Sequence, residues 1–166
     1  MKASLIIIGN EILSGRTQDK NLSYLANWLN EIGIQLTEVR VIRDEEDVIV
    51  ETVNYLRKTY DYVFTTGGIG PTHDDITSES IAKAFSVDLE INQGALSILK
   101  EYYKDGELTE ARIKMTKMPV GSELIENPVS RAPGFKMGNV FVLAGIPGIM
   151  QGMLEGARRF LKNCLL

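Results

Sequence analysis

The residues that point most directly to chemistry lie at positions 65–77, which read TTGGIGPTHDDIT. Gly67, Gly68 and Gly70 let a backbone turn sharply and bring its N–H groups close to a ligand. A helix that starts at Thr77 adds the positive end of a helix dipole, so this segment favours a phosphate ligand. A tight turn between a strand and a helix, without any ligand, accounts for the glycines equally well.

The spacing within this segment excludes two common phosphate-binding motifs. No Gly-Lys pair followed by Ser or Thr is present, and His73 stands where the dinucleotide fingerprint has its third glycine. His73 is also the only histidine of the chain, so a zinc site built from several histidines is excluded. A hydrogen-bonding role is the better interpretation of this side chain.

Three aspartates accompany the glycines. Asp74 and Asp75 follow them directly, and Asp44 follows the preceding predicted strand. Acids at a helix start commonly cap the helix or complement its dipole, which accounts for Asp74 and for Asp44. Beside a bound phosphate, however, a carboxylate is repelled unless a divalent cation lies between them, and Mg²⁺ prefers carboxylate and phosphate oxygens. The three aspartates are therefore also candidate metal ligands.

Two further loops carry polar or glycine-rich sequences. Gly9, Asn10 and Glu11 come directly after the first predicted strand, where side chains face a crevice. Gly145 and Pro147 form a second glycine-rich turn, before the last predicted helix. Two anion sites across one crevice would suit a ligand that contains a pyrophosphate.

A proline-bounded loop at positions 127–135 carries one cation, Arg131. A guanidinium can bind a phosphate with two parallel hydrogen bonds, although a lone surface arginine is more often solvated or ion-paired.

A parallel sheet would bring these loops together. Apolar runs predict three strands and helical spacing predicts two helices between them, in the ranges 2–9, 22–32, 34–42, 44–56 and 60–66. This alternation indicates parallel strands with right-handed crossovers. Ligands bind beyond the carboxyl ends of such strands, so the loops 9–21, 42–46 and 67–77 are predicted to converge on one crevice.

The boundaries of these elements carry local signals. Asn21 and Asp44 are predicted N-caps, and Gly33 is placed to end the first helix. The rest of the chain predicts a helix at 77–85, a short strand at 87–91, helices at 95–103 and 109–117 separated at Asp105, an extended piece at 122–125, a hairpin at 135–143 and a last helix from Pro147. We expect one α/β domain over residues 1–166.

The composition limits the class of protein. Hydrophobic residues make up 44% and charged residues 24%, which is typical of a globular domain. A net charge of -4 argues against a general nucleic-acid surface, so no nucleic-acid partner is expected. The apolar runs are too short to cross a membrane, and the single cysteine, Cys164, cannot form an internal disulfide. We expect a cytoplasmic protein without a membrane partner.

Four ordered segments together resemble the MoaB/Mog family of molybdopterin-binding proteins, and most closely the amino-terminal domain of the CinA (competence/damage-inducible) proteins. They are GNEILSG at 9–15 with Asn21, GGIGPTHDDIT at 67–77, NPVSRAPGF at 127–135 and LAGIPGIM at 143–150. The resemblance implies a three-layer α/β/α sandwich with a mostly parallel sheet. It also implies a homo-oligomer, a dimer or a trimer, that binds a small nucleotide or pterin phosphate.

The resemblance implies two related reactions. In the Mog-like branch, the aspartate matching Asp75 is catalytic, one matching Asp44 lies in the active site, and molybdopterin is adenylylated with Mg-ATP. The CinA-type branch is associated with cleavage of a nucleotide pyrophosphate such as ADP-ribose, with Mg²⁺, Co²⁺ or Ni²⁺ as the metal. The implied phosphate- or substrate-binding residues are Gly9, Asn10, Glu11, Gly67, Gly68, Gly70, Thr72, Thr77, Ser130, Arg131, Gly145 and Pro147.

This sequence departs from the family pattern at three positions. Ala144 replaces a proline, Ile149 replaces an acid, and Arg131 stands where a small or hydroxyl residue is usual. Residues 1–166 match only the amino-terminal domain of CinA proteins, so we do not expect the activity of their carboxy-terminal deamidase domain. The leading hypothesis is a metal-dependent nucleotide pyrophosphatase with Asp75 and Asp44 as catalytic residues. The alternatives are a molybdopterin adenylyltransferase and a regulatory module that binds a pterin or nucleotide without turnover.

Overall fold

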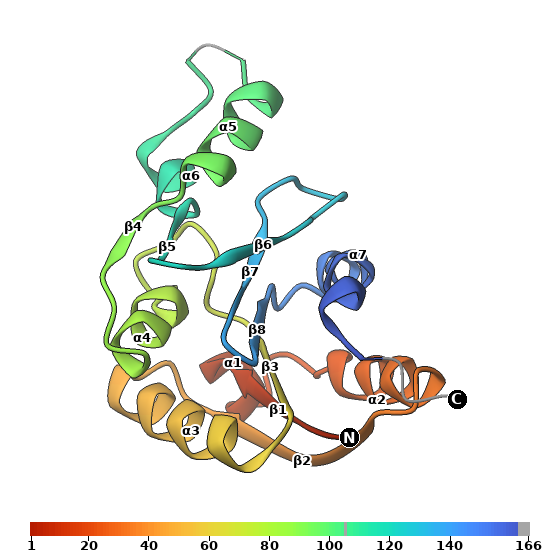
Figure 1. Cartoon of the computed structure of the whole chain (residues 1–166). Helices are drawn as coiled ribbons and strands as arrows, with labels where there is room; N and C mark the ends of the chain where they lie inside the picture. The colour runs from red at the N-terminus through yellow and green to blue at the C-terminus, as the bar shows by residue number, and fades with distance from the viewer. Residues whose placement is uncertain (105, 163–166) are drawn as a thin grey trace.

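The computed structural model describes residues 1–104 and 106–162, so Asp105 and Cys164 lie outside the described part. Its centre is a six-stranded sheet in the order β2-β1-β3-β8-β7-β6 (Figure 1). The strands are β1 (Lys2–Ile8), β2 (Gln35–Ile42), β3 (Tyr62–Thr66), β6 (Glu123–Ile125), β7 (Gly134–Met137) and β8 (Val140–Leu143). The first four in sheet order are parallel, whereas β7 and β6 run antiparallel to their neighbours. The mostly parallel α/β fold is thus confirmed.

Helices cover both faces of this sheet, as Figure 1 shows. One hydrophobic cluster joins Leu5 and Ile7 of β1 to α2 (Asn21–Glu31) and α7 (Pro147–Ala157). A second cluster joins Ile6 and Ile8 to α3 (Glu46–Thr59) and α4 (Thr77–Ala84). Because successive side chains of a strand point to opposite faces, the continuous apolar run of β1 fills both clusters. The three-layer sandwich follows from that burial.

The register of the parallel strands brings their carboxyl ends to one edge. Ile8 pairs with Ile42, Ile7 with Thr66, and Thr66 with Leu143. The loops that follow β1, β2, β3 and β8 therefore leave the sheet side by side.

A smaller unit stands away from the sheet, at the top of Figure 1. This outer unit consists of β4 (Leu89–Ile91), α5 (Gln93–Tyr102), α6 (Glu110–Lys114) and β5 (Lys117–Pro119), and β4 and β5 pair antiparallel. The predicted helix at 109–117 was wrong at its end. Met118 and Pro119 are buried by pairing with β4, and a residue before a proline disfavours the helical conformation.

The start of the chain differs from prediction at two points. A one-turn helix, α1 (Asn10–Leu13), occupies part of the loop expected after β1. Asn21 is the first residue of α2 rather than its N-cap, because the Asp19 carboxylate accepts the N–H of Leu22 at 2.9 Å. The predicted hairpin is confirmed as β7 and β8, whose turn contains Gly138 with a φ of 57°.

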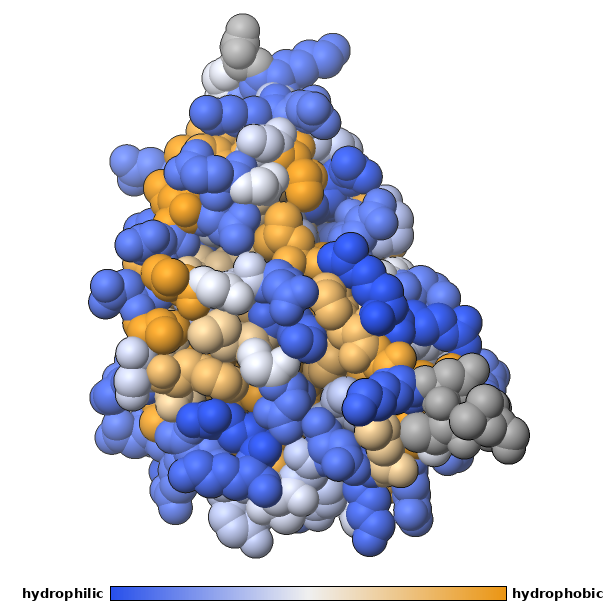
Figure 2. Space-filling view, in the orientation of Figure 1, coloured by the Kyte–Doolittle hydropathy of each residue, from blue (hydrophilic) through white to orange (hydrophobic). Residues whose placement is uncertain are grey.

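The last short element is a 3-10 turn, η1 (Arg158–Phe160), after α7. No helix in the described part is long and apolar enough to span a membrane. Polar and apolar side chains are interspersed over the face drawn in Figure 2.

Candidate functional site

The three loops predicted to converge do so. They line a cleft of about 460 Å³ whose walls include Asn10 and Glu11 after β1, Asp44 after β2, and His73 and Asp74 after β3. We call this space the aspartate cleft. Its lining is mostly polar or charged, which suits a phosphate-bearing ligand with a cation better than an apolar one.

Two glycines of the Gly-rich loop, residues 67–76, are required by the turn itself. Gly67 has a φ of 99°, and a Cβ there would lie 2.2 Å from the carbonyl oxygen of Ile8. Gly68 has a φ of 76°, and its Cβ would lie 2.0 Å from Oγ1 of Thr77. The buried Thr77 hydroxyl donates to the carbonyl oxygen of Gly67 at 2.9 Å. Thr77 therefore holds the loop, rather than facing the cleft.

Asp75 closes the second half of the same loop. Its Oδ2 accepts hydrogen bonds from the N–H of Thr72 at 3.0 Å and from the Thr72 hydroxyl at 2.8 Å. The N-cap of α4 is Ile76, without a side-chain cap, so Asp75 does not cap that helix. A Cβ on Gly70 would lie 2.8 Å from the same carboxylate oxygen. A side chain at position 70 would thus collide with the Asp75 carboxylate.

Asp44 joins the loop after β2 to the loop after β1. Its Oδ2 accepts the N–H of Asn10 at 3.0 Å, and the Asn10 side chain accepts the N–H of Asp44 at 3.2 Å. The interpretation of Asp44 as an N-cap was wrong: α3 begins one residue later, with Glu45 as an N-cap that makes no side-chain bond. The carboxylate is used across two loops instead.

The surroundings of Asp44 favour its protonated form. Partial burial raises the pKa of this carboxyl above its usual value, and the nearby charges of Glu11, Asp75 and Asp74 raise it further. The N–H of Asn10 acts in the opposite direction. A carboxyl group whose pKa is raised in this way is typical of functional sites, and networks of ion pairs shift pKa values as well.

Asp74, which lines the cleft with Asp44 and Glu11, is largely exposed, whereas Asp75 lines a small pocket on the Lys114 side of the same loop. Oδ1 of Asp74 lies 3.3 Å from Nε2 of His73, and both side chains are more than four-fifths exposed. Within residues 1–104 and 106–162, no group of three or more His, Cys, Asp or Glu side chains is arranged to hold a metal ion. An Mg²⁺ shared between one or two carboxylates and substrate phosphates needs no such cage, and the oxygen atoms of Asp44 and Asp75 suit that kind of ion.

The second glycine-rich turn lies beside the first. A Cβ on Gly145 would be 3.1 Å from Cα of Gly67, and the Asn21 side chain donates to the Gly145 carbonyl at 2.9 Å. With Pro147 and Thr66, these residues line a pocket of about 60 Å³. Oδ1 of Asn21 and Oγ1 of Thr66 are buried there and have no hydrogen-bond partner among the residues that the structure describes. The sequence did not reveal these two acceptors, because both depend on contacts across the sheet.

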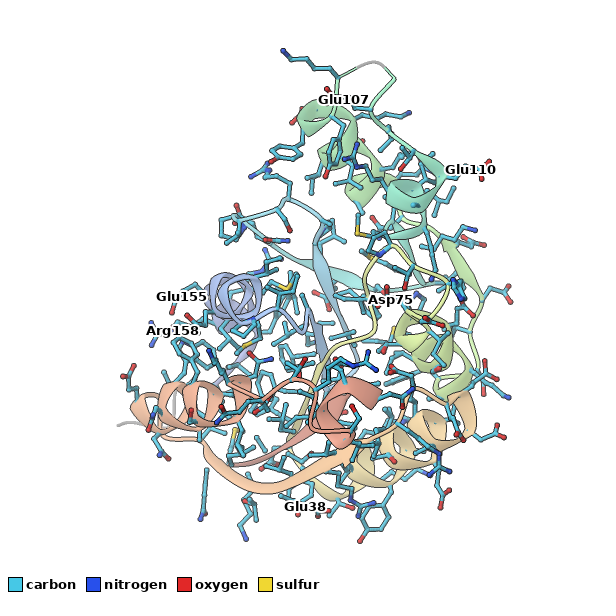
Figure 3. All side chains as sticks on the ribbon, turned by 180° about the vertical axis from the view of Figure 1, so that it is seen from behind. Glu38, Asp75, Glu107, Glu110, Glu155 and Arg158 are labelled. Carbon is cyan, nitrogen blue, oxygen red and sulfur yellow. The ribbon has the colours of Figure 1, made fainter. Side chains whose placement is uncertain are left out.

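Ser130 and Arg131 do not line the aspartate cleft. Arg131 lines a separate hollow of about 450 Å³ together with Glu155 and Arg159. Figure 3 shows Glu155, on α7, well apart from Asp75. Buried Asn127 fixes this loop by donating to the Ser130 hydroxyl at 2.7 Å.

The departures at Ala144 and Ile149 have a packing explanation. Both side chains pack against the hydrophobic cluster between the sheet, α2 and α7. An acid at Ile149 would therefore meet apolar side chains at that cluster.

Lys114 was missed by the sequence analysis. Its Nζ donates to the carbonyl oxygens of Thr72 and Asp75 in the Gly-rich loop. No local signal identifies it, because α6 is far from this loop in sequence.

The family follows from comparison with known proteins. The model of a family described as a probable molybdopterin binding domain matches residues 4–163. The chain belongs to this family. A protein of Thermoplasma acidophilum is 38% identical over 161 residues, 95% of this chain and 63% of its own length. One of Caldivirga maquilingensis is 40% identical over 163 residues, with the same two shares. The chain thus spans less than two thirds of the length of these relatives.

Solved structures agree with this membership. The structure described as the protein CinA with unknown function, from Thermoplasma acidophilum, superposes with a TM-score of 0.88 at 38% identity, over 96% of this molybdopterin-binding-family chain and 98% of its own. The molybdopterin biosynthesis enzyme MoaB from Thermus thermophilus gives 0.62 at 16% identity, over 96% and 91%. The tungsten cofactor synthesizing protein MoaB from Pyrococcus furiosus gives 0.60 at 22%, over 95% and 90%. The last two show the shared fold alone.

Proposed function

We propose that this domain binds a phosphate-bearing nucleotide or pterin in the aspartate cleft and hydrolyses a nucleotide pyrophosphate such as ADP-ribose, with a divalent metal. The observation that carries the proposal is that Asp44 meets Asp74 of the Gly-rich loop in one cleft, where partial burial and, less strongly, neighbouring carboxylates raise the pKa of Asp44. Such a charge cluster is stabilised by a cation, and a phosphate ligand can bring one.

The residues divide the work by their chemistry. Backbone N–H groups at Gly68 and Gly70 would bind phosphate oxygens without adding a cation. The N–H of Gly67 already donates to the Leu143 carbonyl at 3.1 Å, so Gly67 would act by giving the loop its turn. Asp75 and Asp44 would hold Mg²⁺, Co²⁺ or Ni²⁺, with the exposed Asp74 as a further ligand. The metal would neutralise charge on the bridging and leaving oxygens.

The proposal also assigns a role to Asp44 in the reaction and to the loops that border the ligand. Asp44 would orient the attacking water beside the metal, and the proton of that water would pass to solvent. Water then adds across the phosphoanhydride, so that ADP-ribose yields AMP and ribose 5-phosphate. Gly9, Asn10 and Glu11 would border the ligand after β1, whereas Gly145 and Pro147 would border it beside Gly67.

The remaining implied residues take lesser parts in this proposal. Thr72 and Thr77 would act through the loop that they hold, because their hydroxyls bond Asp75 and Gly67. Arg131 would contact only a ligand long enough to reach the separate hollow, and Ser130 would act through the loop that it shares with Arg131.

Release of AMP tests the reaction. Purified protein is incubated with ADP-ribose and other nucleotide pyrophosphates, with each of the three metals in turn. We expect Asp75→Asn to lower turnover about a hundredfold because the negative charge is lost. The amide oxygen can still accept the Thr72 N–H, so the turn should keep its structure. Asp47→Asn, an exposed change on α3, should leave turnover unchanged. No product with any metal or substrate would sink the hydrolase proposal.

The family membership supports a second reaction, the adenylylation of molybdopterin with Mg-ATP. Supplying both substrates and looking for adenylylated pterin by mass spectrometry separates it from hydrolysis. The apolar packing of Ile149 supports a third reading, a regulatory module that binds pterin or nucleotide without turnover. Calorimetric binding of either ligand with no product in either assay would favour that module.

We further propose that the domain works as a homo-oligomer, a dimer or a trimer. Large apolar side chains such as Val129 and Ile146 are 56% and 64% exposed, which suits burial against another copy. Size-exclusion chromatography with light scattering gives the mass in solution, and a monomer at every concentration would contradict this.

A further inference from the structure

The outer unit reaches the Gly-rich loop through one side chain. Lys114 is the last residue of α6, and its ammonium donates to the carbonyl oxygens of Thr72 and Asp75, the latter at 2.7 Å. The two acceptors are the two ends of a single turn. A lysine that contacts a loop only by chance would not be expected to bond both ends of the same turn.

The same turn is closed from its inner side by the Asp75 carboxylate. That carboxylate accepts both the N–H and the hydroxyl of Thr72, and the N–H of Asp75 donates to the Thr72 carbonyl at 3.2 Å. The Thr72 carbonyl thus receives a second donor from Lys114. Hydrogen bonds from a charged donor are about twice as strong as neutral ones. The turn that carries the Asp75 side chain is thus bonded to a cation that belongs to another part of the fold.

The ammonium of Lys114 lies in a different pocket from the acids of the aspartate cleft. Lys114 lines a small pocket with Gly68, Gly70 and Asp75, on the side of the Gly-rich loop next to the outer unit. The aspartate cleft, by contrast, is lined by Asp44 and Asp74. Lys114 therefore contacts the turn from a pocket that Asp44 and Asp74 do not line.

We infer that Lys114 is a positioning residue for Asp75. It fixes the Thr72–Asp75 turn by binding both of its carbonyls, and so makes the outer unit a support of the site. The inference rests on the proposed function only in that Asp75 acts on a phosphate-bearing ligand. Loss of the lysine should loosen the turn and misdirect the carboxylate, while the sheet and its helices remain intact.

Three variants test this role in the full chain. Lys114→Met removes the donors and keeps the length of the side chain, whereas Lys114→Arg keeps charge and donors. Lys100→Met, at an exposed position of α5 in the same outer unit, is the matched control. The first measurement is amide hydrogen exchange by NMR, which needs no substrate. The amides of Thr72 and Asp75 report the turn, and buried Leu29 of α2 reports the global fold.

We expect Lys114→Met to speed exchange at both turn amides about tenfold or more, with Leu29 unchanged. Lys114→Arg and Lys100→Met should exchange like the wild type. Equal exchange in Lys114→Met and wild type would overturn the inference, and so would faster exchange of Leu29 by the same factor, because that result means global destabilisation.

The second measurement is turnover with the substrate found in the AMP-release or adenylylation assay. Misdirection of Asp75 should lower kcat about tenfold or more in Lys114→Met, with KM changed less than about threefold and kcat restored in Lys114→Arg. A rise in KM with kcat unchanged would assign Lys114 to substrate binding and would contradict a positioning role. If the wild type shows no turnover, the proposed function fails, and the exchange result alone decides whether Lys114 holds the turn.

Discussion

Asp44 lies in the aspartate cleft at a cost to the stability of the fold. Its carboxylate is partly buried beside other acids, and within residues 1–104 and 106–162 the one hydrogen bond that stabilises its charge comes from the N–H of Asn10. At pH 7 the ionised form is therefore less favourable in the folded chain than in the unfolded chain. Acids that are placed against their own electrostatic preference are typical of sites where stability is exchanged for function.

Replacing this acid should stabilise the protein. Because the folded pKa of Asp44 lies above its ordinary value of 3.8, the native state binds the proton more tightly than the unfolded state. Stability is therefore lost as pH rises from about that value through the folded pKa. Asp44→Asn should gain about 0.5–1 kcal/mol at pH 7, and the gain should vanish below the unfolded pKa. Urea unfolding at several pH values measures this.

A second aspartate provides the comparison for that experiment. Asp47 is exposed in the first turn of α3, where a negative charge complements the helix dipole. Asp47→Asn should leave stability equal or slightly lower at pH 7. If Asp44→Asn were destabilising at pH 7 and Asp47→Asn were not, the burial argument for Asp44 would be refuted.

At the scale of the element, the Gly-rich loop is limited by space as well as by backbone conformation. Gly68 and Gly15 both have a φ of 76°, but only Gly68 has a neighbour, Oγ1 of Thr77, at 2.0 Å from a built Cβ. Gly15 has no atom within 4 Å of that position. The pair therefore separates the cost of the conformation from the cost of the contact.

We expect Gly15→Ala to destabilise the protein by about 1 kcal/mol, and Gly68→Ala to cost about 1–3 kcal/mol more. The extra cost arises because the Thr77 hydroxyl is held on the Gly67 carbonyl and must move. Chemical denaturation of the two variants under identical conditions gives the difference. Equal losses would mean that Thr77 yields freely and does not hold the loop.

The elements that sequence predicted well are those with a strong internal pattern. The apolar run of β1 and the helical stripe of α3, for example, are visible without any partner. The end of α6 and strand β5 were missed because Met118 becomes extended only by pairing with β4. Asp44 was misassigned for the same kind of reason, since its partner Asn10 lies on another loop.

The location of the site was more predictable than its details. Topology alone places the loops after β1, β2 and β3 at one edge, and Asp44 and Asp74 are indeed found in one cleft there. Arg131 was grouped with them, although antiparallel β6 and β7 carry its loop to a separate hollow. Local sequence patterns predict the parallel strands, whereas the path of an irregular loop depends on long-range contacts that no local pattern shows.

For the whole molecule, the lack of a metal cage in the described part predicts how ligands bind. Mg²⁺ alone should leave the unfolding temperature unchanged, because the carboxylates need substrate phosphates to complete the coordination. Mg²⁺ together with a non-hydrolysable ADP-ribose analogue at about a hundredfold excess over Kd should raise it by about 5–10 °C. Scanning fluorimetry measures both, with Asp75→Asn as the control variant. A large shift with Mg²⁺ alone would indicate a preformed site.

The place of β8 in the sheet has a consequence for synthesis of the chain. Strand β3 is buried along its whole length, and its second neighbour, β8, is made only after the outer unit and β6 and β7. During synthesis on the ribosome, one hydrogen-bonding edge of β3 therefore stays unpaired until the chain through β8 has emerged. Such an edge is a template for pairing with other chains. Nascent chains that stop before Val140 should depend on chaperones, whereas chains that include α7 should fold without them.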